Sequence, residues 1–258
     1  MSQQQIDELI AKLAKQSKPY AWFEKEFSQI DELSLIDFDL QNVELLGLGV
    51  NLNSKNEISL KSKSTKIKDE IFCVVDIEST GSIKNGQIIE IGAIKIQNGK
   101  ELERFESLIK ADDVPENISE LTGINASMLK NAPNLPTVLN HFRLFLKDSI
   151  FVAHNVKFDY NFISSSLYKC GFGVLLNQNL CTIELSKRLI PSQKYSLAAL
   201  KEVLSINTPH HRALNDAKSA AKILKHCLGK LPFYVENTQD LINFSKSNLK
   251  PNLPCSAQ

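Results

Sequence analysis

Ile71-Phe72-Cys73-Val74-Val75-Asp76-Ile77-Glu78 is the stretch that decides the fold of this chain. Five apolar residues in a row are typical of a β-strand that is buried on both faces. Asp76 and Glu78 end the run, where a charge is costly unless a partner offsets it. Side chains alternate along a strand, so these two carboxylates share one face and stand about 7 Å apart along it. The pair suits a divalent metal ion, and we expect a metal site there.

The residues that follow predict a mixed α/β sheet. Residues 88–96 are largely apolar, and Asn98-Gly99 is a strong signal for a two-residue hairpin that leads into a strand at 101–109. A fourth strand is expected at 150–153 and a fifth near Leu180, with helical patterns between and after them. Three antiparallel strands followed by alternating helices and parallel strands give a five-stranded α/β sheet flanked by helices.

Changes of pattern along the chain predict two domains and a tail. Residues 1–68 match short helices followed by a hairpin, which indicates a small N-terminal helical or winged-helix-like domain. The sheet and its helices occupy 69–230, and 231–258 is expected to form a C-terminal tail that contacts a partner. Four lysines recur between 61 and 68. We interpret them as a solvated linker, and the alternative is a wing that touches phosphates.

Composition and charge are those of an ordinary globular protein. The chain has 258 residues, is 43% hydrophobic and carries a formal net charge of +1. A chain that binds long nucleic acid alone is usually more basic, so any nucleic-acid contact is expected to be short or shared with a partner. No apolar stretch is long enough to span a bilayer, and the polar N-terminus is unlike a signal peptide. Five scattered cysteines indicate reduced thiols in a cytoplasm and argue against a zinc site.

Two further acids complete a candidate metal site. Asp159 follows the fourth strand, and Asp216 begins the last helix beside its apolar stripe. With Asp76 and Glu78 they offer hard oxygen ligands, which favour Mg²⁺ or Mn²⁺ over zinc. Such sites, with two metal ions, are typical of phosphodiester hydrolysis. His211, five residues before Asp216, is the expected general base, because a histidine side chain usually titrates near working pH.

Alternatives to this interpretation stay open in the sequence. Each acid could be a helix cap or a surface charge. A glycosidase pair would account for the two strand carboxylates but leaves the other acids and the histidine without a role. His210 adjoins His211, and the spacing to Asp216 favours His211 as the base. Glu90 lies in an apolar strand and could be a fifth acid near the site; we expect it instead to face a neighbouring polar group and leave it out of the site.

Three motifs resemble those of a known family. They are Asp-Ile-Glu-Ser-Thr-Gly at 76–81, His-Asn-x-x-Phe-Asp at 154–159 and His-Arg-Ala-x-x-Asp at 211–216. In their order they resemble the three motifs of the DEDDh 3′→5′ exonucleases. The resemblance covers about residues 70–228. It implies a ribonuclease-H-like fold, which agrees with the sheet expected above.

The resemblance implies roles for single residues. Asp76, Glu78, Asp159 and Asp216 would hold two divalent ions, Mg²⁺ or Mn²⁺, with Asp76 bridging both. His211 would be the general base. The implied reaction releases 5′-nucleoside monophosphates from the 3′ end of DNA, with single-stranded or frayed ends preferred.

The resemblance also implies contacts with the substrate strand. Thr80 and Gly81 resemble the turn that approaches the terminal nucleotide. Leu121 lies in a Leu-Thr-Gly-Ile loop that resembles the one placing an apolar wedge near the 3′ terminal base, and the alternative is a core residue. The remaining residues, which are either substrate contacts or packing residues, are His154, Asn155 and Phe158.

Within this family, the chain resembles most nearly the proofreading epsilon subunits of bacterial DNA polymerase III. That likeness implies a role in DNA replication and the polymerase alpha subunit as a partner. Gln239–Phe244 is similar to the short peptides that bind the bacterial sliding clamp, and the alternative is a capped terminal helix packed on the body. The extra N-terminal domain keeps other roles open: DNA repair, RNA trimming or turnover, or a binding module whose nuclease is incidental.

Overall fold

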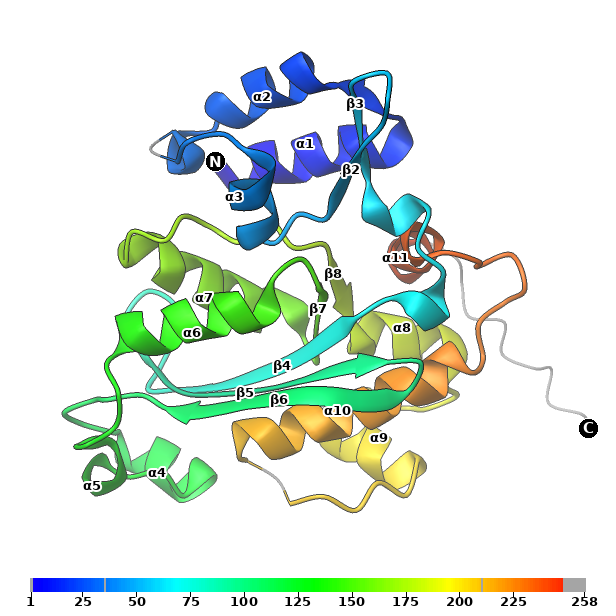
Figure 1. The fold of residues 1–258 in the computed structure, drawn as a ribbon. Helices are drawn as coiled ribbons and strands as arrows, with labels where there is room; N and C mark the ends of the chain where they lie inside the picture. Colours follow the sequence, from blue (N-terminus) through cyan, green and yellow to red (C-terminus); the bar gives the residue numbers. More distant parts are fainter. Residues whose placement is uncertain (1, 35, 210, 248–258) are drawn as a thin grey trace, which may run out of the picture.

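The computed structural model describes residues 2–34, 36–209 and 211–247 (Figure 1). The expectations for His210 and for the end of the tail, 248–258, lie outside the described residues. Among the residues described, no helix combines the length and the apolar character needed to cross a membrane. The four cysteines in this part of the chain are free thiols.

A mixed sheet of five strands forms the centre of the molecule (Figure 1). The strands are β4 (Phe72–Ser79), β5 (Ile88–Gln97), β6 (Lys100–Leu108), β7 (Ile150–Ala153) and β8 (Asn179–Cys181). They lie in the order β6-β5-β4-β7-β8. The first three pair antiparallel, and β4, β7 and β8 pair in parallel. The α/β sheet predicted from the sequence is therefore confirmed.

Helices cover both faces of this sheet. One face carries α6 (Leu135–Leu146) and α7 (Val156–Lys169). The other face carries α8 (Thr182–Leu189), α9 (Leu197–Val203), α10 (Ala213–Leu228) and α11 (Thr238–Lys246). Two short helices, α4 (Glu116–Thr122) and α5 (Ala126–Leu129), pack beside β5 through a small apolar cluster around Ile89.

The central strand β4 is buried on both faces, as its apolar run predicts. Phe72 and Val74 lie in the core on the α10 side. Cys73 and Val75 lie in the opposite core, with α6 and α7. Because side chains alternate along a strand, Asp76 is directed to the α10 side.

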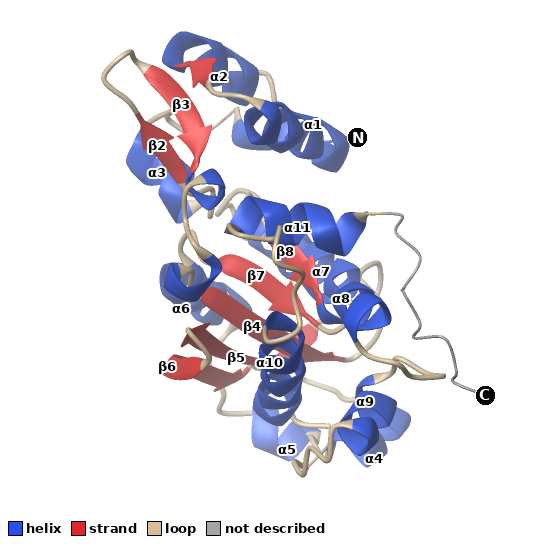
Figure 2. Ribbon diagram, turned by 90° about the vertical axis from the view of Figure 1, so that its right-hand side faces the viewer, coloured by secondary structure: helices blue, strands red, loops and turns tan. Residues whose placement is uncertain are grey.

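The N-terminal unit has the arrangement expected of a winged-helix-like domain. Its helices and strands follow one another as α1 (Ser2–Lys15), β1 (Lys18–Pro19), α2 (Tyr20–Ser28), α3 (Leu40–Leu45), β2 (Val50–Leu52) and β3 (Glu57–Leu60). The strands form an antiparallel sheet in the order β1-β3-β2. The unit stands as a separate layer beyond the large sheet (Figure 2).

This unit is packed onto the large domain and shares a core with it. Val174 and Leu176, from the segment before β8, are buried in the same apolar cluster as α1 and α2. The Leu176 amide donates to the Leu46 carbonyl oxygen at 2.8 Å. Lys61 pairs with Asp148 at 2.6 Å between their charged atoms. We therefore expect the unit to move with the large domain.

The charge of the N-terminal unit disfavours a role in binding phosphates. Residues 1–60 contain ten acidic and five basic residues, a net charge of −5. The four lysines between 61 and 68 follow the β2–β3 hairpin, in a linker with two short 3-10 turns at Lys61–Lys63 and Ile67–Asp69; Lys66 directly precedes the second turn. The structure thus favours the linker interpretation over the phosphate-binding wing.

Gln239–Phe244 is not an exposed peptide. It forms most of α11, which begins with a capping box between Asn237 and Asp240. Leu241 is fully buried, and Phe244 is 8% exposed, in the core beneath α8 and α10. The anchor side chains that a sliding clamp would need are therefore inside the protein. The structure favours the alternative considered from the sequence, a capped terminal helix.

We predict that Leu241→Ala lowers the free energy of unfolding by about 3 kcal/mol, because it leaves a cavity in a packed core. Urea unfolding measures the change. Asn243→Ala, on the exposed side of the same helix, is the matched control: it removes only the hydrogen bond from Gln239 Nε2 and should cost about 1 kcal/mol or less. If Leu241→Ala lowers the free energy of unfolding no more than Asn243→Ala does, α11 is not packed as described.

Candidate active site

Three carboxylates meet where β4 ends and α10 begins. Asp76 and Glu78 come from the end of β4, and Asp216 comes from the first turn of α10. Each offers an oxygen, and these oxygens all lie within 4.8 Å of one another. Asp216 is buried, and the other two are partly exposed. This set of hard oxygen ligands suits Mg²⁺ or a similar divalent ion.

Asp159 lies close to this cluster but is held differently. It stands in the first turn of α7 and is 4% exposed. Its Oδ1 accepts a hydrogen bond from the Ile77 amide at 3.2 Å. The structure therefore brings Asp159 to the site from the opposite face of the sheet, and its role as a metal ligand stays a prediction.

Burial and mutual repulsion keep Asp76, Glu78 and Asp159 from ionising easily. Burial raises the pKa of Asp76 well above its usual range, and the charges of Asp159 and Glu78 raise it further. Burial, with the neighbouring Glu90 charge, raises the pKa of Glu78 to about 7. Burial raises the pKa of Asp159 to about 8. A bound cation would relieve this repulsion, so the pKa shifts also fit a metal site.

An ion pair between a buried glutamate and a partly exposed arginine fixes the start of α10 beside the cluster. Glu90 is fully buried and lies directly opposite Glu78 on β5. Arg212 donates to Glu90 Oε1 from Nη2 at 2.6 Å and from Nε at 3.0 Å. The Ala213 amide donates to Glu90 Oε2 at 2.9 Å, which satisfies one of the open amides of the helix N-terminus.

The expectation that Glu90 faces a polar group is confirmed, but its importance was missed. The signals were in the sequence: an acid inside an apolar strand, and an arginine directly after the motif histidine. Nothing in either pattern shows that the two side chains meet across 122 positions of the chain.

Gly92 permits this close approach of α10 to the sheet. A Cβ atom at Gly92 would lie 2.1 Å from the Leu214 nitrogen and 2.3 Å from the Ala213 carbonyl carbon. Both atoms are backbone, so no side chain could turn away to make room. Only glycine allows the helix to begin against β5, and this contact sets the position of Asp216 opposite β4.

His211 lies at the exposed edge of the same cluster. Its φ of 62° is in the left-handed region, which is uncommon for a residue other than glycine. The His211 amide donates to Asp216 Oδ2 at 3.0 Å. Arg212, the next residue, is tied to Glu90. The backbone on which the expected general base stands is therefore fixed on both sides, and its catalytic role stays a prediction.

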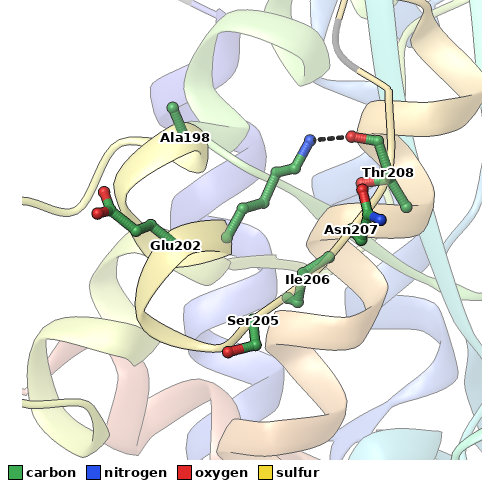
Figure 3. Close-up of a pocket in the computed structure, with 7 residues that line it drawn as sticks. Ala198, Glu202, Ser205, Ile206, Asn207 and Thr208 are labelled. Carbon is green, nitrogen blue, oxygen red and sulfur yellow. Dashed lines mark hydrogen bonds between the residues drawn. The ribbon is translucent and has the colours of Figure 1, made fainter.

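The segment that leads into the histidine motif is anchored by Lys201. This lysine of α9 is 5% exposed, and its ammonium donates to the Thr208 carbonyl oxygen at 2.6 Å (Figure 3). The Thr208 hydroxyl in turn lies 2.6 Å from the hydroxyl of Ser219 on α10. A shallow cavity of about 510 Å³ lies beside these contacts. No local pattern in the sequence predicts this anchor.

The predicted substrate contacts fall into two groups. Thr80 and Gly81 form a closed turn just beyond Glu78, where the Gln87 amide donates to Thr80 Oγ1 at 3.0 Å. Leu121 and Phe158 are exposed, at 52% and 37% respectively, and are thus available for contact.

His154 is hydrogen-bonded within the protein, whereas Asn155 is exposed. The Thr182 hydroxyl donates to His154 Nδ1 at 2.8 Å, and Nε2 donates to the Tyr195 carbonyl oxygen at 3.0 Å. Burial lowers the pKa of His154 to about 4, so the ring is neutral near pH 7. Asn155 takes a left-handed conformation at the N-terminus of α7. The structure favours the packing alternative for His154.

Comparison with known proteins agrees with this geometry. A family model described as "Exonuclease" matches residues 73–224, more than half of the chain. A DNA polymerase III of the PolC type from Caldanaerobacter subterraneus is 44% identical over 164 residues, which cover 62% of this chain and 12% of that protein. The PolC-type polymerase of Thermotoga petrophila is 35% identical over 201 residues, which cover 74% of this chain and 14% of that protein. This chain thus spans about an eighth of the length of these relatives.

Solved structures show the same fold. Exonuclease X, in a complex with 5′-overhanging duplex DNA, aligns with 67% of this chain and 99% of its own, at a TM-score of 0.54 and 24% identity. Escherichia coli exonuclease I, in a complex with a dA16 oligonucleotide, aligns with 63% of this chain and 41% of its own, at a TM-score of 0.56 and 15% identity. The ribonuclease-H-like fold expected from the sequence is confirmed.

We predict that the metal-free protein loses stability as pH rises. Glu78 and Asp159 keep protons when folded at pH values where the unfolded chain has released them. Their contribution is complete below about pH 4 and is lost as pH rises through about 7 to 8. The thermal midpoint in EDTA should therefore fall between pH 5 and pH 9, and added Mg²⁺ or Mn²⁺ should restore it at the upper end.

Asp159→Asn is the matched variant for this measurement, because it keeps the volume and can still accept from the Ile77 amide. Its midpoint should fall less steeply than that of the wild type. A slope as steep as the wild-type slope would contradict the raised pKa of Asp159.

We further predict that Glu90→Gln destabilises the protein by about 2 kcal/mol, because the Arg212 guanidinium and the Ala213 amide lose their hydrogen bonds to a charged acceptor. Urea unfolding measures the loss. Glu103→Gln, at an exposed position of β6, is the control and should be nearly neutral. If Glu90→Gln unfolds at the wild-type urea concentration, the ion pair does not stabilise the start of α10.

Proposed function

The chain belongs to the exonuclease family, and on that premise we propose that it is a metal-dependent 3′→5′ exonuclease that shortens DNA from its 3′ end. The observation that carries the proposal is the meeting of Asp76, Glu78 and Asp216 within 4.8 Å, at the edge where His211 is exposed. A carboxylate cluster beside an exposed imidazole suits hydrolysis of a phosphodiester bond with metal assistance.

The residues of this cluster have distinct roles in the proposal. Asp76, Glu78 and Asp216 hold divalent ions, with Asp159 completing the set. Two ions, Mg²⁺ or Mn²⁺, supply a more acidic water and charge stabilisation of the leaving 3′ oxygen.

His211 takes the proton of the attacking water. A new bond forms between the water oxygen and phosphorus, the bond from phosphorus to the 3′ oxygen breaks, and that oxygen gains a proton. The products are a 5′-nucleoside monophosphate and a strand with a free 3′ hydroxyl. The ion pair between Arg212 and Glu90 holds the His211 backbone beside the acids.

The substrate strand approaches the same edge. The Thr80–Gly81 turn stands next to Glu78, and the exposed side chains of Leu121 and Phe158 offer apolar surface to the terminal bases. A single-stranded or frayed end fits such a site better than a paired one, because a paired end must first unstack.

We place this activity in DNA replication, as proofreading. The PolC-type relatives are DNA polymerases III by name, and both structural neighbours described above were solved with DNA. These findings support a polymerase III context, with the polymerase subunit as partner and the cytoplasm as location. Both polymerase relatives are of the PolC type, so they support a polymerase III context more strongly than the resemblance to epsilon subunits.

We predict that the purified chain with Mg²⁺ or Mn²⁺ digests DNA oligonucleotides from the 3′ end, and that mispaired ends are digested faster than paired ends. Matched DNA and RNA oligonucleotides with a 5′ label, resolved on a denaturing gel, test this directly. Cleavage of RNA alone would overturn the assignment to proofreading and favour RNA trimming.

Two variants separate catalysis from contamination and from metal binding. Asp76→Asn should reduce turnover at least about a thousandfold, because it removes a ligand of the metal site. His211→Ala should slow the reaction by about 10²- to 10⁴-fold, the range of a lost general base, while the thermal shift produced by Mn²⁺ persists. Full activity of Asp76→Asn would show that the metal site lies elsewhere.

A further inference from the structure

A second concave surface lies at the other end of β4, away from the acids. It encloses about 590 Å³ between the linker after the N-terminal unit, the β5–β6 turn, the end of α10 and the loop that follows. Phe72, the first residue of β4, lies at its base, about 13 Å along the strand from Asp76. We call this surface the linker groove.

The walls of the linker groove are largely aliphatic. Ile67, Leu228 and Leu231 line it, and all three are partly exposed. Phe233 stands at its rim and is 94% exposed. A solvent-exposed aromatic ring beside an apolar groove is typical of a surface that binds a partner, because burial of the ring on binding is favourable.

Lysines surround these apolar walls. Lys66, Lys68 and Lys225 line the groove and are exposed, and Glu236 is the acid among the lining residues. Within the described residues, none of the three lysines lies in an ion pair. The three lysines outnumber this one acid, so the groove carries a net positive charge, which attracts an acidic partner.

We propose that the linker groove binds an acidic peptide segment of a partner protein. A bulky apolar side chain of the peptide enters between Ile67 and Leu231, and its carboxylates meet Lys66, Lys68 and Lys225. The charges complement one another, and the aliphatic walls select an apolar side chain rather than a phosphate backbone.

Two other occupants fit less well. The chain's own end, residues 248–258, contains no acid and carries Lys250, so its charge does not complement the lysines. Nucleic acid would need cations spaced along a backbone and flat faces for stacking, whereas most of the walls are branched aliphatic side chains. The groove also lies at the opposite end of β4 from the proposed 3′-end site. The proposal therefore does not depend on nuclease activity.

The test measures fluorescence anisotropy of a labelled peptide that alternates aspartate with leucine and ends in phenylalanine, added to the full chain. We expect saturable binding that weakens at high salt, because screening reduces the charge attraction. The matched peptide with asparagine for every aspartate should bind at least about tenfold more weakly.

Variants locate the binding site. Lys66→Glu with Lys225→Glu should weaken binding at least about tenfold, and Phe233→Ser should weaken it also. Lys222→Glu, exposed on α10 outside the groove, is the control and should bind as the wild type does. Circular dichroism confirms that each variant is folded.

Three results would overturn the proposal. They are absence of binding up to about 1 mM peptide, equal binding of the neutral peptide, and binding unaffected by the lysine and Phe233 variants. If a single-stranded oligonucleotide binds instead, and the double lysine variant abolishes that binding, the groove is a nucleic-acid site.

Discussion

The candidate site depends on one interaction, the ion pair between the buried Glu90 and the partly exposed Arg212. Glu90 is fully buried in β5, and its oxygens are taken up by the Arg212 guanidinium and by the Ala213 amide. These contacts hold the start of α10 against the sheet, and Gly92 permits the close approach because it has no Cβ atom. The position at which α10 begins is therefore fixed. That placement brings Asp216 to the acids of β4 and fixes the backbone of His211 beside them.

The ion pair also solves an electrostatic problem. Glu78 and Glu90 are direct neighbours across β4 and β5, and their like charges repel. The Arg212 charge lowers the pKa of Glu78, against the effects of burial and of Glu90. Arg212 thus neutralises Glu90. The repulsion that remains among the carboxylates of the cluster would be relieved by a bound cation. The apolar cores on both sides of β4 offset the cost of holding these carboxylates together before a cation binds.

Local patterns predicted the parts of the site that lie on single elements. The acids of β4 follow from an apolar run and its alternation, and Asp216 follows from a helical stripe, because each pattern is contained in a few residues. Interactions between distant segments were not predictable in this way. The partner of Glu90, the sharing of a core between the N-terminal unit and Leu176, and the burial of Leu241 all depend on how elements pack. For the same reason Gln239–Phe244 resembled an exposed peptide in the sequence and forms a buried helix in the structure.

Two elements connect the candidate site to the linker groove. β4 has Phe72 at the groove and Asp76 in the acid cluster, and α10 carries Asp216 in its first turn and Lys225 near its end. The two surfaces share no residue, so a substrate end and an acidic partner can be bound at the same time. Both elements are packed in the same core, so the candidate site and the linker groove have little freedom to shift relative to one another. A partner bound in the groove would therefore be held in a fixed orientation to the 3′ end, and would act by placing the nuclease rather than by covering its site.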